Sequence, residues 1–162
     1  MTSYLLLGVL ATGPYSGVSV DTLMDTPILE RREIAALPAA EFARRARGAR
    51  LEGEGEEAAA VLGEGFSLEW EVDLPAREAL LQLSGSAPSL GSDSLWVALD
   101  GQRVPTPLTF SRGAFSQRTL SLEVPVAGRH VIGLSLREGP GARVRSLSLV
   151  QLSVKSPLPP MR

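Results

Sequence analysis

The chain has 162 residues, of which 44% are hydrophobic and 21% are charged, and its formal net charge at pH 7 is −2. The apolar fraction excludes wholesale disorder, no apolar run approaches the ~20 residues of a membrane helix, and the weakly acidic balance gives no support for nucleic-acid binding. The length suits one domain with an additional arm or tail, and the absence of cysteine excludes disulfides and thiol catalysis. We therefore expect a globular protein with no membrane and no nucleic acid among its partners.

The amino-terminal region has apolar pieces but no pattern long enough to build a core of its own. Residues 4–11 (YLLLGVLA) predict a buried strand, and because residues 1–3 (MTS) carry no basic side chain, the sequence does not favour a secretory signal. We expect residues 1–37 to form an extended arm that lies on its own domain or on a neighbouring subunit. The side chains expected to make assembly contacts are Tyr4, Leu5, Leu7, Val9, Ile28 and Leu29.

The next two segments precede the main strand pattern. Residues 39–50 (AAEFARRARGAR) contain good helix formers, but Gly48 and the strand-like flanks leave both helix and strand open. Residues 51–60 (LEGEGEEAAA) are acidic and punctuated by glycine, which predicts a solvated loop.

From residue 66 onward the hydrophobic pattern has a period of two, which is typical of half-buried strands. The first predicted strand, which Pro75 ends, places five apolar side chains on one face: Phe66, Leu68, Trp70, Val72 and Leu74. Further strands are expected at residues 79–83, 94–99, 120–124, 130–136 and 144–154. Asp100-Gly101 predicts a tight turn that folds residues 102–104 back onto the preceding strand. This spacing predicts an antiparallel sandwich or barrel.

Four segments, in this order, resemble the β-jelly-roll carbohydrate-binding modules, which are galactose-binding-like sandwiches appended to glycoside hydrolases. They are Glu41-Phe42, residues 65–75 (GFSLEWEVDLP), residues 95–101 (LWVALDG) and residues 124–130 (VPVAGRH). The resemblance covers about residues 40–152. It implies an all-β fold: an antiparallel β-sandwich (jelly roll) over residues 38–155, with the extended arm of residues 1–37 before it and a Pro-rich tail of residues 156–162 after it.

The resemblance also implies where ligands and metal would lie. In this family aromatic side chains in loops stack on sugar rings, and the loop of residues 111–115 keeps Phe115. The family's structural calcium draws on an early acidic residue, for which Glu41 is the candidate, and on a second in the last strand, where this chain has Ser146 and Ser148. Calcium needs several oxygen ligands, preferably charged, so we predict no metal site and no cofactor.

Two tryptophans and one histidine can be assigned from the pattern. Trp70 lies on the apolar face of its strand, which predicts core packing. Trp96 shares the less apolar face with Asp100, and both a binding platform and structural burial stay open for it. His130 is in register with Ile132, which predicts a position at the margin of the sheet. Trp96, Asp100 and Phe115 are the candidate ligand-binding residues.

Motifs for catalysis are missing from the chain. No G-x-S-x-G nucleophile motif occurs, and the glycines of residues 53–65 are not followed by the Lys-Ser/Thr of a phosphate loop. We therefore predict that the protein is not an enzyme.

Two functional hypotheses remain. The main one is a structural subunit that packs on copies of itself or on other structural subunits in a virion (capsid decoration or tail) or an extracellular surface filament. The alternative is a glycan-binding module for cell-surface or polymeric sugars.

Overall fold

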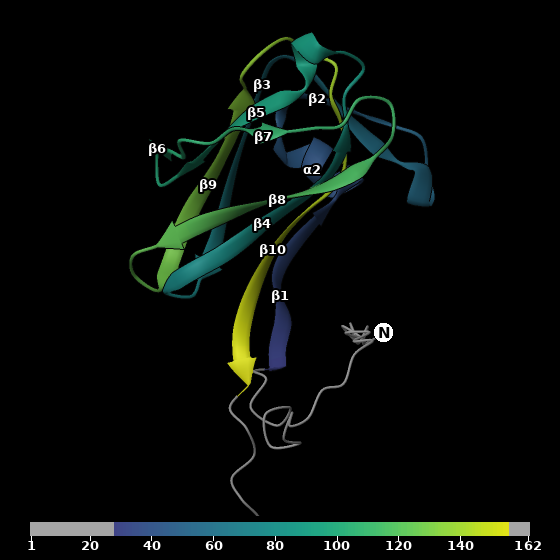
Figure 1. Cartoon of the computed structure of the whole chain (residues 1–162). Helices are drawn as coiled ribbons and strands as arrows, with labels where there is room; N and C mark the ends of the chain where they lie inside the picture. Colours follow the sequence, from purple (N-terminus) through teal and green to yellow (C-terminus); the bar gives the residue numbers. More distant parts are fainter. Residues whose placement is uncertain (1–27, 156–162) are drawn as a thin grey trace, which may run out of the picture. The chain divides into compact units, whose positions relative to one another are not determined.

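Ten strands form one curled antiparallel sheet in the computed structural model, which describes residues 28–155 (Figure 1). The strands are β1 (Ile28–Pro38), β2 (Arg47–Glu52), β3 (Ala59–Leu74), β4 (Arg77–Ser86), β5 (Ser94–Leu99), β6 (Gln102–Arg103), β7 (Leu108–Thr109), β8 (Ser116–Val124), β9 (Gly128–Leu136) and β10 (Arg143–Lys155). The helical segments are α2 (Ala39–Arg45), η1 (Gly55–Glu57) and η2 (Leu90–Ser92). The predicted all-β antiparallel fold is confirmed.

The strands follow the order β6-β5-β9-β3-β10-β4-β8, with β1 beside β10, β2 beside β3 and β7 beside β5. The pairing of β3 with β10 is confined to Val61↔Arg143 and Ala60↔Val144. The sheet curls at this short junction and forms two layers. The first layer contains β2, β3, β9, β5, β6 and β7, and the second contains β1, β10, β4 and β8.

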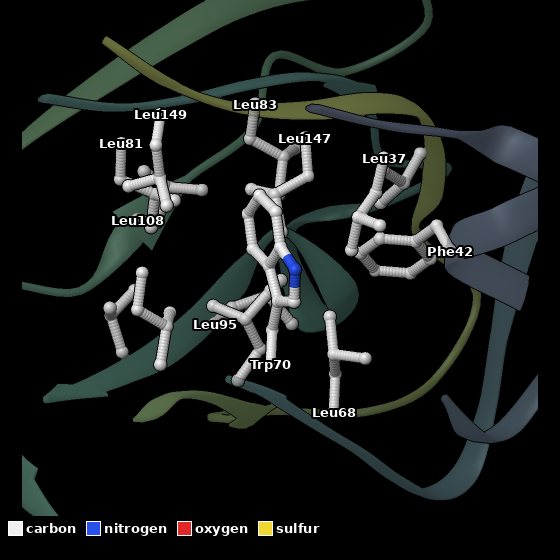
Figure 2. Packing of buried hydrophobic residues seen from close by; sticks show 14 of the residues in the cluster. Leu37, Phe42, Leu68, Trp70, Leu81, Leu83, Leu95, Leu108, Leu147 and Leu149 are labelled. Carbon is white, nitrogen blue, oxygen red and sulfur yellow. The ribbon is translucent and has the colours of Figure 1, made fainter. Parts of the chain in front are cut away.

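The inward faces of the two layers meet in one hydrophobic core (Figure 2). Trp70 of β3 lies at its centre and is 4% exposed, as its place in the period-two pattern predicts. In the second layer, cross-strand partners pack side by side: Leu83 opposite Leu147 and Leu81 opposite Leu149. Burial of these large apolar side chains is the main force that holds the layers together.

The alternation expected for β3 is confirmed, but this strand starts earlier than its hydrophobic pattern. Phe66, Leu68 and Leu74 are buried on the inward face. Ala59 and Ala60 already belong to β3 and are at most 1% exposed, while residues 51–52 end β2. The prediction of a solvated loop over residues 51–60 is therefore wrong at both ends, because alanine is small enough to be buried where β2 pairs with β3.

Residues 39–50, for which the sequence allowed both a helix and a strand, contain both. Residues 39–45 form α2, whose Phe42 is fully buried and stacks on Phe66 with ring centroids 5.9 Å apart. After Ala46 the chain turns into β2, where Gly48 has a φ of +70° and a Cβ there would lie 2.9 Å from the Glu64 carbonyl oxygen. Glycine is therefore required at this bulge.

Part of the expected arm belongs to the sandwich. Residues 28–38 form β1, which pairs with β10, and Leu37 is 3% exposed in the core. Leu29 is exposed on the same strand. Tyr4, Leu5, Leu7 and Val9 lie outside the described residues, as does the Pro-rich tail. In the described part of the chain, no helix is long and apolar enough to cross a membrane.

Candidate functional site

Trp96 lies half-buried on the outward face of β5. It faces outward because its neighbours Leu95 and Val97 point into the core, where both are fully buried. The guanidinium carbon of Arg103 lies 4.4 Å from the centroid of the indole ring, and that of Arg137 lies 5.5 Å from it. These cation–π contacts hold the indole at the surface in a defined orientation.

The cross-strand register shows what surrounds the indole. One row across three strands of the first layer contains Trp96, Ser135 and Ser67, and the next row on this face contains Arg103, Ala98, Gly133 and Glu69. We call these seven residues the Trp96 face. A Cβ at Gly133 would lie 3.6 Å from that of Ala98, so the two positions share a side of the sheet. Small side chains thus leave a shallow floor beside the indole, bordered by the Glu69 carboxylate and the Arg103 guanidinium.

A two-residue turn connects β5 to β6 beside the Trp96 face. Asp100 and Gly101 have φ angles of +51° and +82°, and positive φ at both central residues is the requirement of a type I′ turn. The turn predicted from Asp100-Gly101 is confirmed. Its register pairs Leu99 with Gln102 and Ala98 with Arg103, so Gln102 and Arg103 project to opposite sides of β6.

A groove of about 640 Å³ lies between this hairpin and β8. Its lining includes Leu99, Val104 and Leu122 among the apolar residues and Gln102, Arg103, Ser121 and Glu123 among the polar ones. A second hollow of about 720 Å³ shares Gln102, Ser121 and Glu123 with it and also reaches Arg77 and Glu78. Hydrogen-bonding side chains therefore surround an apolar floor at this edge of the sandwich.

Asp100 lines the groove, but both of its carboxylate oxygens bind protein groups. Oδ1 accepts a hydrogen bond from the Val131 amide at 2.9 Å, and Oδ2 lies 2.6 Å from Nδ1 of His130. The hydrogen bond from His130, and then the one from the Val131 amide, lower the pKa of Asp100. The structure therefore gives Asp100 a role in holding the hairpin.

His130 connects the hairpin to the turn between β8 and β9. Its Nε2 lies 2.6 Å from the carbonyl oxygen of Val126, while Nδ1 faces Asp100. Both neighbours are acceptors, so the imidazolium form, which donates from both nitrogens, fits the site best. The Asp100 carboxylate, with the Val126 carbonyl, raises the pKa of His130. His130 lies near the start of β9 and is 8% exposed as a whole residue.

Phe115 lies away from the other two candidates. It precedes β8, and the guanidinium carbon of Arg145 lies 3.8 Å from the centroid of its ring. The groove touches β8 at its other end, near Glu123, and eight residues of strand span roughly 26 Å. Trp96 and Asp100 therefore lie on the same hairpin, with Arg103 over the indole and beside Asp100 in the groove lining, and Phe115 lies at a separate place.

Glu41 is engaged inside its own helix. Arg44 Nη2 donates to Oε1 at 2.5 Å, and Arg45 Nε donates to the same oxygen at 2.9 Å. Arg44 first, and then Arg45, lower the pKa of Glu41. Among residues 28–155, no three histidine, cysteine, aspartate or glutamate side chains are grouped as a metal site would require.

The sequence reasoning missed the residues that flank Trp96. For Arg103 a signal existed, because a two-residue turn at Asp100-Gly101 forces residue 103 opposite residue 98, on the side of Trp96. Arg137 had no such local signal, since its position follows from the pairing of β9 with β5. Gln102 and Glu123 meet at the groove for the same non-local reason.

Comparison with known proteins identifies the architecture. No family model matches the chain, and no curated protein matches it. The solved structures that share the fold include the C-terminal CBM6 of the laminarinase LamC from Zobellia galactanivorans (TM-score 0.59, 16% identity, 72% of this chain and 100% of that one), a family 35 carbohydrate-binding module from Clostridium thermocellum (0.54, 18%, 71% and 97%) and the module CBM6cm-2 of Cellvibrio mixtus lichenase 5A in complex with cellotriose (0.56, 18%, 77% and 99%). At such identities the similarity concerns the fold. The chain has the β-sandwich fold of carbohydrate-binding modules, as its sequence motifs predict.

Proposed function

We propose that this protein is a non-catalytic carbohydrate-binding module and that the Trp96 face is its sugar-binding surface. The observation that carries the proposal is the half-buried indole beside the floor formed by Ala98 and Gly133. The fold of the three compared modules supports it, and one of those structures contains a bound cellotriose.

The chemistry of the face matches that of a sugar ring. A pyranose has an apolar face of C–H groups, which packs on an aromatic ring, and a rim of hydroxyls, each of which donates and accepts hydrogen bonds. The Glu69 carboxylate accepts, and the Arg103 and Arg137 guanidinium groups donate. Stacking requires a guanidinium to leave the indole, and we expect Arg103 to do so because its side chain is exposed.

Binding without bond cleavage agrees with how the polar groups are used. The single histidine is engaged on both nitrogens, with Asp100 and Val126. An engaged imidazolium is a poor general base, because it has no lone pair to accept a proton.

A glycan array followed by titration calorimetry tests the proposal. We expect Trp96→Ala to weaken the binding of the best glycan by more than about tenfold, since a tryptophan at the centre of a contact carries much of the binding energy. Trp96→Phe keeps an aromatic ring and should therefore lose less affinity. Phe115→Ala is the matched control, because it removes an aromatic ring far from this face. Binding that survives Trp96→Ala but not Phe115→Ala would place the sugar at the loop before β8 and contradict the proposal.

A role in assembly is the second candidate, and one observation favours it. Leu29 of β1 and Leu152 of β10 are 62% and 48% exposed on strands that lie beside each other. Contiguous exposed apolar surface marks contact sites between proteins, and neighbouring exposed side chains on β1 and β10 would contribute to such a surface. Membership of a virion or an extracellular filament is a proposal from the sequence. Sedimentation of the full chain tests self-association, and a monomer at every concentration would contradict it.

A further inference from the structure

We infer that the groove between the β5–β6 hairpin and β8 continues the sugar site, so that the protein binds a neutral oligosaccharide along two connected surfaces. The inference rests on the proposed function and adds the class of ligand to it. Both surfaces belong to the same hairpin, and Arg103 is part of each.

The position of the groove follows from the topology. β6 and β8 are the two end strands of the sheet order, and the sheet curls so that they border one groove of about 640 Å³. From Trp96 to Asp100 the hairpin covers four residues of β5, roughly 13 Å. A single sugar ring on the indole therefore reaches Arg103 at the near edge of the groove but not the part beyond the turn, whereas a chain of several sugar units does.

The lining suits hydroxyl groups. Gln102 offers both an amide donor and a carbonyl acceptor, and it lines both hollows. The Ser121 hydroxyl donates to Oε1 of Glu78 at 2.6 Å, which orients that carboxylate. Below them, Leu99 and Leu122 provide an apolar floor for C–H groups.

The charges indicate a neutral ligand. Glu78 and Glu123 are direct partners across β4 and β8, so two carboxylates stand side by side at the rim. Asp100 is already paired with the His130 imidazolium, so the two hollows offer the carboxylates of Glu78 and Glu123 beside the guanidinium groups of Arg77 and Arg103. An acidic group of a uronic or sulfated sugar placed against the two adjacent carboxylates would be repelled, whereas a neutral sugar can donate its hydroxyls to both.

An extended peptide fits the groove less well. A peptide would add to the edge of β8, but the charged Arg118 and Glu123 and the following Pro125 are features that protect edges from such pairing. An oligosaccharide needs only the side chains.

Nitrogen–proton correlation spectra of the full chain test the inference with two probes in one experiment. The indole N–H of Trp96 reports on the Trp96 face, and the side-chain amide of Gln102 reports on the groove; Trp96→Phe and Gln102→Ala assign the two signals. The ligands are neutral and uronic oligosaccharides of increasing length from a glycan that binds in the array. We expect short neutral sugars to shift Trp96 alone, longer ones to shift both signals, and uronic ones to shift Gln102 least.

Affinities supply the second readout. Gln102→Ala combined with Glu123→Gln should lower the affinity for the longest neutral oligosaccharide by roughly tenfold and leave the affinity for the shortest one unchanged. Gln117→Ala, at the opposite end of β8, is the matched control and should change neither of these two affinities. If the Gln102 amide signal does not shift with the longest sugar, or shifts only with a strand-forming peptide of alternating Thr and Val, the inference is overturned while the proposed function stands. No shift at Trp96 with any sugar overturns both.

Discussion

A single histidine joins two turns that are distant in sequence. His130 bonds to the turn before β6 through Asp100 and to the turn before β9 through Val126. Both turns border the groove, so the protonation of one ring influences the walls of the candidate site. Because the chain has only one histidine, its titration can be observed without overlap from another.

We expect the melting temperature to be highest between pH 3.8 and pH 6.5, the ordinary values for aspartate and histidine. The pKa of His130 is raised in the folded protein, so its stabilising contribution is complete below pH 6.5 and is lost as the pH rises through the folded value. The pKa of Asp100 is lowered, so its contribution is present above pH 3.8 and is lost as the pH falls through the folded value. Thermal unfolding followed by circular dichroism across the pH range measures both the alkaline and the acidic decline of the melting temperature.

The variant His130→Gln provides the control for the decline of the melting temperature at alkaline pH. Glutamine keeps a donor and an acceptor but does not titrate, so the decline above pH 6.5 should flatten. An equally steep decline in the variant would assign it to another group.

Individual site residues could be predicted from the sequence only where local geometry decides them. The outward position of Trp96 follows from alternation along β5, and the turn at Asp100-Gly101 follows from the residue types. The engagement of Asp100 by His130 does not, because it depends on how β9 pairs with β5. Phe115 was selected through the family resemblance, and the fold places it away from Trp96.

At the scale of elements, the strands with a clear period of two were predictable, whereas β1, β2 and the helix were not. Strands β5, β8 and β9 follow from their period of two, since one face of each is buried. The helix α2 has seven residues, too short for a helical period to be distinguished from the strand that follows it. What decides its place is a tertiary contact, the stacking of Phe42 on Phe66.

Phe42→Ala should therefore destabilise the protein by about 3–5 kcal/mol, the cost of removing a fully buried phenylalanine. Phe42 is 0% exposed and anchors α2 over β3. Urea unfolding followed by tryptophan fluorescence measures the change. Leu90→Ala is the control, because Leu90 is 64% exposed and its loss should change stability by no more than about 0.5 kcal/mol. A cost for Phe42→Ala near that of the control would mean that α2 is not held by this contact.

At the scale of the whole molecule, pairing between distant strands sets the architecture. β3 pairs with β9 and β4 with β8, and both partners lie tens of residues apart in the chain. A pattern of alternation identifies such strands but does not state which pair or where the sheet turns over. The resemblance to carbohydrate-binding modules predicted a two-layered sandwich, which the compared structures bear out, but it did not assign the strand pairs.

Deletion of residues 1–27 should leave the thermal transition of the sandwich in place, because residues 29–153 contain the core. Deletion of residues 1–38 removes β1 with the buried Leu37 and should lower the melting temperature by several degrees. Differential scanning calorimetry compares the two. A collapse of the transition in the shorter deletion would show that the first 27 residues are part of the folded unit.

The neighbouring strands β1 and β10 have a mechanical consequence. They run in opposite directions, and β1 starts at the end where β10 finishes (Figure 1). The backbone hydrogen bonds between antiparallel strands lie perpendicular to the strands. Tension applied at the start of β1 and the end of β10 would therefore break the hydrogen bonds between these two strands one after another, so that β1 would detach at low force until the buried Leu37 is reached.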